Sequence, residues 1–352
     1  MQSLRLAIVA IVSLTLIFFI FNDRTKLLAS SGAVFVQQQF GHLITKAGFG
    51  LGREDAMLVV GDVMLGRDVE KIIEAYGLLY PFKHIKDELQ TTVVLGNFEA
   101  AVPKVHVPTP AFGMVLSVDK QNLESLSRSG FTHLSLANNH SYDFGSGGLV
   151  DTKDALTLYG FKIFGEPQNI SSDSISYVEI NDVPIAIIAV DAVSGYPEHS
   201  ELDPILEIAK RGSAMQMVYI HWGEEYQGRH NSAEERFAHA LVDAGVDLVV
   251  GHHPHVVQDI EEYNGALIFY SLGNFVFDQY FESEVQIGLA LHIELNEEKG
   301  EVTLLPVDSR GSKASPQLMT RETRSSFLED LARKSSSSLT ETLKTGQLEF
   351  SF

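Results

Sequence analysis

Short apolar runs that alternate with helical stretches are the feature that most limits what this chain can fold into. Apolar runs bounded by Gly, Asp or Asn predict buried strands at residues 56–62, 91–99, 131–140, 183–191, 215–223, 246–255 and 266–275. Residues 122–130, 148–160 and 232–245 predict helices, and Ser232 and Glu235 have the spacing of a capping box. Strand–helix alternation of this kind is typical of an α/β or layered α/β/α fold.

The composition excludes several classes of site and partner. The 352 residues contain no cysteine, which rules out disulfides, thiolate metal sites, a cysteine nucleophile and a lipid-modified cysteine. The formal net charge is −20, and no long run of Lys or Arg interrupts it. Because such an acidic chain repels polyanions, we expect no nucleic-acid partner. A bound divalent metal ion would reverse the charge locally.

An apolar run at residues 6–21 predicts a membrane segment at the N-terminus. Its density in Phe and Ile favours a retained single-pass anchor, with the catalytic domain outside the cytoplasm. The alternative is a signal peptide cleaved near residues 27–33, which would release a secreted protein. We expect antiparallel edge strands at 285–295 and 301–308. The expected divisions are an anchor or signal at 1–22, a linker at 23–55, the main domain at 56–310 and a polar, partly helical tail at 311–352.

Polar and ionisable residues gather where the predicted strands end. They are Asp62, Glu99, Asn139, His140, His221, His253 and His255. In open α/β sheets, ligands bind at the carboxyl ends of the strands. Oxygen and nitrogen donors without sulfur suit Mn, Zn, Fe or Mg. A pair of metal ions needs a bridging carboxylate, which Glu99 or Asp62 would supply.

The densest part of this pattern is Gly251–Gln258, where three histidines lie within four residues. Pro254 fixes its own backbone φ, so the turn after the strand is stiff and can aim His253 and His255 into one pocket. His252 has the opposite parity and is expected to point elsewhere, behind the ligands or at the edge of the pocket. The alternative is a cluster of surface histidines or of hydrogen-bonded core histidines. The other donor-bearing strand ends favour metal binding.

Six segments, taken together and in order, resemble the CapA family of capsule and poly-γ-glutamate biosynthesis proteins, within the calcineurin-like metallophosphoesterase superfamily. The resemblance covers roughly residues 56–310. The segments are GDVMLGR (61–67), NFE (97–99), LANNHSYDFGSGGL (136–149), HWGEEY (221–226), GHHPHVVQ (251–258) and YSLGNFVFDQ (270–279).

The resemblance implies a four-layer α/β/β/α sandwich with flanking helices and a dinuclear metal site. The implied metal ligands are Asp62, Glu99, Asn139, His221, His253 and His255. His140 would be the catalytic histidine beside the phosphate, and Asp143 would orient it. The sequence departs from the superfamily pattern at Met64, where a histidine is usual, and at Asn97, where an aspartate is usual.

On the substrate side we expect Arg67, Glu224 and Asn274. Arg67 would grip an oxyanion or form a surface ion pair. Two classes of function remain open. One is a metal-dependent hydrolase acting on a phosphoester. The other is a polymer-binding or scaffold subunit, without turnover, in a capsule assembly complex. The implied partners are the membrane, capsule synthase subunits, and a polyanionic polymer or phosphoester substrate.

Overall fold

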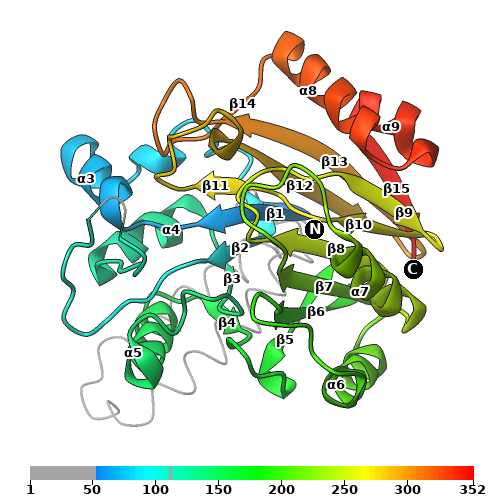
Figure 1. Ribbon diagram of the computed structural model, residues 1–352, viewed down its shortest axis with the longest axis horizontal. Helices are drawn as coiled ribbons and strands as arrows, with labels where there is room; N and C mark the ends of the chain where they lie inside the picture. Colours follow the sequence, from blue (N-terminus) through cyan, green and yellow to red (C-terminus); the bar gives the residue numbers. More distant parts are fainter. Residues whose placement is uncertain (1–52, 111–112) are drawn as a thin grey trace, which may run out of the picture. The chain divides into compact units, whose positions relative to one another are not determined.

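Two β-sheets form the centre of the computed structural model (Figure 1), which describes residues 53–110 and 113–352. The first sheet has the order β14-β13-β12-β1-β2-β3-β4, with β11 beside β1 and β15 beside β13. Its strands are β1 Glu54–Val63, β2 Thr91–Phe98, β3 His133–Ser135, β4 Lys162–Phe164, β11 Asn274–Val276, β12 Ile287–Leu295, β13 Lys299–Asp308, β14 Gln317–Leu318 and β15 Gln347–Ser351.

The second sheet has the order β5-β6-β7-β8-β10-β9. Its strands are β5 Ile175–Ile180, β6 Val183–Asp191, β7 Met215–His221, β8 Leu248–His252, β9 Ile260–Tyr263 and β10 Ala266–Phe269. The helices are α3 Arg67–Tyr76, α4 Leu123–Ser129, α5 Gly145–Leu158, α6 His199–Gly212, α7 Ser232–Asp243, α8 Arg321–Lys334 and α9 Thr340–Thr345.

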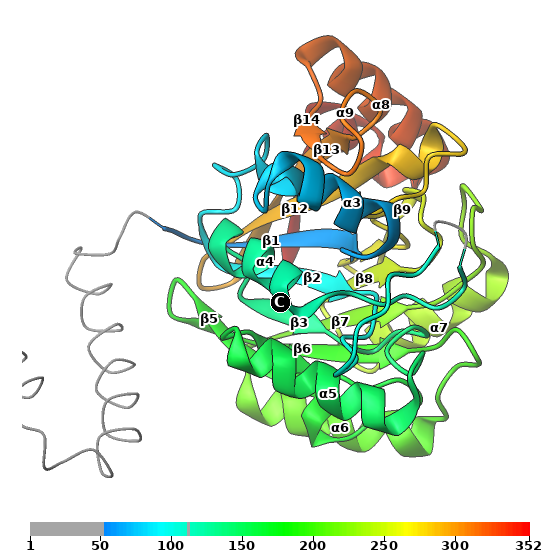
Figure 2. The ribbon, with the colours of Figure 1, turned by 90° about the vertical axis from the view of Figure 1, so that its left-hand side faces the viewer.

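Side chains along the buried strands alternate between the two faces of each sheet. One apolar core therefore lies between the sheets, and one lies on each outer face. In β1, Met57 and Val59 face the central core, whereas Leu58 and Val60 join the outer core under α4 and α5. β6 alternates in the same way, and its outer residues pack under α6 and α7. Successive strand side chains point to opposite faces, so a strand buried on both faces is apolar throughout. The expected four-layer α/β/β/α fold is confirmed, and Figure 2 shows α3 and α6 on opposite sides of the strands.

The parallel strands bring their carboxyl ends to one edge. β1, β2, β3 and β4 run parallel in the first sheet, and β6, β7, β8 and β10 run parallel in the second. The last residues of β1 and β7 and the segments that follow β2, β3 and β8 carry the predicted donor residues. This edge is where open α/β sheets bind ligands.

Several elements differ from the sequence expectations. β12 and β13 are antiparallel as expected, but neither is an edge strand: β12 lies between β1 and β13, and β13 also pairs with β14 and β15. The capping box of α7 is formed by Asn231 and Glu234, one residue before the expected pair, because Asn231 is the residue whose side chain accepts the free backbone N–H groups.

Residues 311–352, expected as a polar tail, contribute to the core of the domain. They are partly helical, and β15 also pairs with β13. Leu328, Leu331 and Phe350 join the central core. The apolar side chains of α8 are widely spaced among polar residues, so the segment looks polar in the sequence. Residues 54–352 form one compact unit.

The N-terminal anchor and linker at 1–22 and 23–55 lie almost entirely outside the described residues. Within residues 53–110 and 113–352, no helix is long and apolar enough to cross a membrane.

Candidate metal centre

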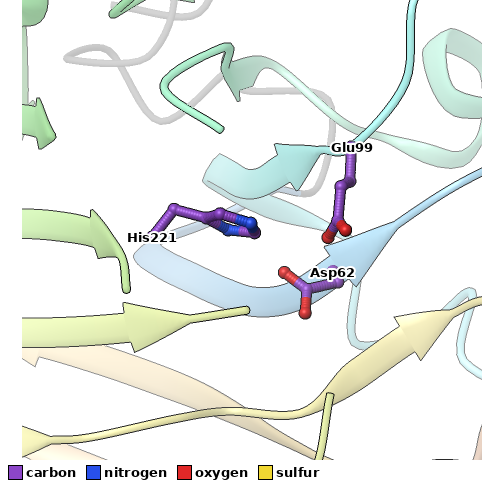
Figure 3. Close-up of side chains that lie close together, drawn as sticks. All are labelled: Asp62, Glu99 and His221. Atoms are coloured by element: carbon purple, nitrogen blue, oxygen red, sulfur yellow. The ribbon is translucent and has the colours of Figure 1, made fainter. Parts of the chain in front are cut away.

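Three side chains from different strand ends converge on one buried point (Figure 3). Asp62 is the next-to-last residue of β1, Glu99 follows β2 and His221 ends β7. Each offers a ligand atom, and these atoms lie within 4.8 Å of one another. Asp62 and Glu99 have no exposed surface, and His221 is 1% exposed. The register that pairs Asp62 with Asn97 of β2 and with Asn274 of β11 fixes the carboxylate at this edge.

Asn97 holds this group together, and the sequence analysis did not select it. Its amide nitrogen donates to Asp62 Oδ1 at 2.8 Å and to Glu99 Oε2 at 3.3 Å, and lies 3.2 Å from His221 Nδ1. Its amide oxygen accepts a hydrogen bond from Asn138. The departure from the superfamily pattern at this position therefore puts a neutral donor between two buried carboxylates, where an aspartate would add a third charge.

The turn after β8 divides its histidines between two parts of the site. His253 and His255 both have positive φ angles, 96° and 59°, on either side of Pro254. Non-glycine residues at positive φ are strained and tend to occur at functional sites. His253 Nδ1 lies 3.2 Å from His221 Nε2, and His255 Nδ1 lies 3.2 Å from Asp62 Oδ2. The two imidazoles thus face different members of the cluster, as two adjacent ions would require.

His252 was expected to point elsewhere, behind the ligands or at the edge of the pocket. It is fully buried, with Nδ1 3.6 Å from Asp62 Oδ1 and its ring centroid 4.1 Å from that of Tyr219. Neither ring nitrogen has a hydrogen-bond partner among the described residues. His252 therefore packs against the Oδ1 side of Asp62, whereas His255 lies beside Oδ2.

The protonation states follow from burial and charge. Burial lowers the pKa of His252 and of His253 to about 4, and it lowers the pKa of His221 well below its ordinary value. These imidazoles are therefore neutral near pH 7 and keep a lone pair for a metal ion. Burial, together with the charge of Asp62, raises the pKa of Glu99 well above its ordinary value.

The pKa of Asp62 shifts in the opposite direction to that of Glu99. Burial disfavours its charged form, but contact with His255 and the other imidazoles more than offsets this and lowers the pKa of Asp62. Throughout the described chain, neither carboxylate forms an ion pair with Lys or Arg. The centre therefore contains buried negative charge that no fixed cation of the protein balances.

The residues present fit a divalent cation. Asp62 Oδ2 and Glu99 Oε1 are buried without a hydrogen-bond partner in the described structure. Buried polar atoms in folded proteins are nearly always paired, so two carboxylate oxygens without partners beside neutral imidazoles suit a bound cation. The donor set contains nitrogen and oxygen only, which suits Mn, Zn or Fe.

Asn139 and His140 sit together at the mouth of this centre. Asn139 Oδ1 lies 2.9 Å from His221 Nε2, so the asparagine reaches the donor cluster. His140 Nε2 lies 3.9 Å from Glu99 Oε1, and its Nδ1 is 2.9 Å from Asp143 Oδ2. Asp143 also accepts the backbone N–H of Leu116 at 2.6 Å. Asp143 is therefore placed to hold the orientation of His140 and to tie it to the loop before Leu116.

A cavity of about 410 Å³ opens beside the centre. His140 and His255 reach it from the metal side. The rest of its lining includes Arg67, Asp68, Gly113, Met114, Leu116, Glu225, Tyr226, Phe277, Asp278, Gln279, Tyr280 and Phe281. Aromatic rings and acidic groups dominate this wall. Several of them fall within the segments 221–226 and 270–279 that carry the family resemblance. The others lie outside the six segments, where no sequence pattern marks a pocket wall: Asp68, Gly113, Met114, Leu116, Tyr280 and Phe281.

The three expected substrate contacts have different surroundings. Arg67 lines the cavity and is 9% exposed, and its guanidinium forms a buried ion pair with Asp278. Glu224 is exposed and does not line the cavity, whereas its neighbour Glu225 does. The positive φ of Gly223 and Tyr226 turns this segment so that Glu225 faces inward.

Asn274 is buried and does not line the cavity. Its Oδ1 lies 3.0 Å from His255 Nδ1, and its amide donates to Gln279 and to the carbonyl of Val285. It is therefore placed to orient His255.

Met64, where the sequence resemblance implies a histidine, has its sulfur against the backbone. Met64 Sδ accepts the N–H of Gly66 at 3.0 Å, and the side chain is fully buried in the outer core. The imidazole beside Asp62 Oδ2 is that of His255.

Comparison with known proteins places these features in a family. Residues 56–279 match the family described as bacterial capsule synthesis protein PGA_cap. The chain is 34% identical over 274 residues to the PGA biosynthesis protein CapA of Bacillus subtilis, covering 73% of this chain and 72% of that protein. It is 36% identical over 245 residues to the capsule biosynthesis protein CapA of Bacillus anthracis, covering 63% of this chain and 60% of that protein.

Among solved structures, a putative 5'-nucleotidase from Staphylococcus aureus in complex with alpha-ketoglutarate superposes with a TM-score of 0.46. It is 15% identical, over 69% of this chain and 51% of the other. A hypothetical protein from Thermus thermophilus gives a TM-score of 0.44 at 17% identity, over 74% of this chain and 95% of the other. Neither likeness bears on function. The family match spans the whole donor-bearing edge, and on that ground this chain belongs to the bacterial capsule synthesis protein family PGA_cap.

Proposed function

We propose that this chain is a metal-dependent phosphoester hydrolase that acts in capsule or poly-γ-glutamate biosynthesis. One observation carries the proposal. Asp62, Glu99 and His221 converge with two orphaned carboxylate oxygens, beside a cavity that also contains His140. Family membership supports the biological setting, because the relatives are named as capsule and PGA biosynthesis proteins.

Two ions of Mn, Zn, Fe or Mg would be held by the donors Asp62, Glu99, Asn139, His221, His253 and His255. Bound there, such ions would supply Lewis-acid polarisation of a phosphoryl oxygen and a nucleophile at neutral pH. Glu99 lies between the Asp62 side and the His140 side of the cluster, and this favours it as the shared carboxylate.

The chain's own residues supply the proton transfer and the positioning. His140 sits on the cavity wall and would protonate the leaving oxygen of the ester. Asp143 holds the Nδ1 side of that ring, so Nε2 is the nitrogen that faces the reacting group. Arg67 would contribute positive charge to the cavity, although Asp278 already neutralises part of it.

The substrate is expected to be anionic, and the chain's charge of −20 opposes its capture by electrostatics alone. Metal ions would provide the local positive charge at the cavity, and the acidic wall residues Asp68 and Glu225 would limit how a long polyanion lies there. We therefore favour recognition of one phosphoester group over binding along a polymer.

The test is turnover by purified protein from which metal has been removed and then restored. With Mn²⁺, the protein should cleave aryl phosphate mono- or diesters, and His140→Ala should lose about 10²–10⁴-fold in kcat. Glu224→Gln, at an exposed glutamate off the cavity, is the matched control and should retain activity. No turnover on a broad ester panel at full metal loading would contradict the proposal.

A second candidate is a polymer-binding or scaffold subunit without turnover. The position of Met64 favours it, because Met64 Sδ pairs with a backbone N–H where the superfamily supplies a metal-ligating histidine. Under this alternative, loss of the chain reduces surface polymer, and restoring the His140→Ala variant returns polymer to the wild-type level.

We further propose that the chain is retained at the cell membrane by residues 1–22 and works there with capsule synthase subunits. The apolar run at 6–21 and the family setting support this. Fractionation of cells that express the full chain tests retention, since a cleaved signal would release the domain to the medium.

A further inference from the structure

A second group of possible metal ligands lies apart from the candidate centre. Glu70 of α3, His106 of the loop after β2, and Asp119 each offer a ligand atom, and these atoms lie within 4.8 Å of one another. Glu70 is 6% exposed, and His106 and Asp119 are half-buried. From this arrangement we infer that Glu70, His106 and Asp119 form an accessory divalent-cation site of the Zn²⁺ or Mn²⁺ type.

Both ring nitrogens of His106 have polar partners. His106 Nε2 lies 2.9 Å and 3.1 Å from the two carboxylate oxygens of Glu70, which is hydrogen-bond distance. Two ligands about 2.1 Å from one tetrahedral ion lie about 3.4 Å apart, so binding an ion would need these groups to separate by only a few tenths of an ångström. The other ring nitrogen, Nδ1, is 2.7 Å from the hydroxyl of Ser117, which is fully buried. A metal-ligating histidine usually has its second nitrogen fixed by such a partner.

The charge around the group favours a cation. Burial raises the pKa of Glu70, and the carboxylates of Glu74 and Asp119 both raise it further by charge repulsion. Within the described part of the chain, neither Glu70 nor Asp119 forms an ion pair with Lys or Arg. Asp119 Oδ1 accepts the N–H of Gln121, which leaves its second oxygen for a ligand. One imidazole and two carboxylates, open to solvent on one side, suit Zn²⁺ or Mn²⁺ with water completing the shell.

A third group of similar composition is less suited to a metal ion. Glu235, His239 and Glu261 also lie within ligand distance of one another. There, however, one oxygen of Glu261 accepts the Tyr270 hydroxyl at 2.6 Å and the other lies 3.0 Å from His239 Nε2. The His239 ring stacks on Tyr263 with a centroid distance of 3.7 Å. Both oxygens of Glu261 are therefore occupied, whereas within the described residues only Oδ1 of Asp119 accepts a hydrogen bond.

The position of the accessory site connects it to the main cavity. α3 begins at Arg67, which lines the cavity, and Glu70 lies one helical turn later. His106 is on the segment that continues to Gly113, whose carbonyl accepts from Arg67 at 3.1 Å. The same segment reaches Leu116, whose N–H binds Asp143. An ion at Glu70, His106 and Asp119 would therefore join α3 to the segment that borders the cavity.

The test is the number of Zn²⁺ ions bound per chain, measured by elemental analysis after metal removal and re-equilibration. It uses a background in which the main centre is disabled by Asp62→Asn with His221→Asn. In this background we expect one bound Zn²⁺, which is lost when Glu70→Gln and His106→Asn are added. Glu74→Gln is the matched control, since Glu74 lies near the group but outside it, and it should retain the ion.

Two outcomes would overturn the inference: no Zn²⁺ bound in the disabled background, or the same count after Glu70→Gln with His106→Asn. Circular dichroism confirms folding of each variant. If the combined variants fail to fold, His106→Asn alone in the otherwise wild-type chain should bind one Zn²⁺ fewer than the wild type. An unchanged count there also refutes the site. Because the ions are counted without an activity assay, failure here leaves the proposed hydrolase untouched, and failure of the hydrolase leaves this site untouched.

Discussion

The substitution Glu99→Gln should change stability in opposite directions with and without metal. Glu99 and Asp62 are fully buried, and their ligand atoms lie within 4.8 Å of each other. Two unit charges at that separation repel by about 3 kcal/mol at an effective dielectric constant near 20. The raised pKa of Glu99 reflects how strongly burial and Asp62 disfavour its charge, so the relief on removing that charge is smaller than the full repulsion, on the order of 1–2 kcal/mol.

In metal-free protein, Glu99→Gln should therefore raise the melting temperature by about 2–6 °C. With Mn²⁺ at about 100 times its Kd, binding should stabilise the wild type by about 2.7 kcal/mol. Loss of one ligand that weakens binding tenfold would reduce this gain to about 1.4 kcal/mol in the variant.

The assay is thermal unfolding of both proteins in chelator and in a series of Mn²⁺ concentrations. Glu224→Gln is the control, because Glu224 is exposed and off the cavity, and it should shift neither curve. A variant that is less stable than the wild type in chelator, or that gains as much from Mn²⁺, would refute the reasoning.

Three further predictions concern positioning, packing and pH. Asp143→Asn should lower kcat by about 10–100-fold, and in the His140→Ala background it should have no further effect, because Asp143 acts through that ring; additive losses in steady-state kinetics would contradict this. Gly251→Ala should destabilise the fold by more than about 2 kcal/mol, since its Cβ would meet the Tyr270 carbonyl at 2.0 Å; an unchanged denaturant midpoint would count against the packing. Burial lowers the pKa of His133 to about 4, so the unfolded chain takes up a proton first and stability falls as pH drops from about 6.5 to 4. His133→Gln should reduce this loss of stability. The free energy of unfolding, measured by urea titration at several pH values, should fall less steeply in the variant, and an equal pH dependence in the two proteins would contradict this.

The sequence predicted the layered fold because its strands are buried on both faces and end in polar residues. The polar residues at the ends of these apolar strands also pointed to Asp62, to His221 and to the turn with His253 and His255. These positions are fixed by strand ends, which apolar runs mark clearly.

The remaining parts depend on three-dimensional packing that no local pattern reports. Asn97 joins three ligands only because β1 and β2 are in register. Glu225 faces the cavity in place of Glu224 because of positive φ angles on either side of it. The C-terminal residues 311–352 contact the segment that follows His255. The ammonium of Lys334 donates to the carbonyl of Val257 at 2.6 Å. Such contacts join residues that are far apart in the sequence, so no local pattern predicts them.

The most direct test of the metal centre is a crystal structure of the purified chain soaked with Mn²⁺, with anomalous scattering used to locate the ions. We expect anomalous peaks among Asp62, Glu99, His221, His253 and His255, with Glu99 within coordination distance of more than one ion. No peak at this edge of the sheets, with Asp62 Oδ2 and Glu99 Oε1 still without partners, would contradict it.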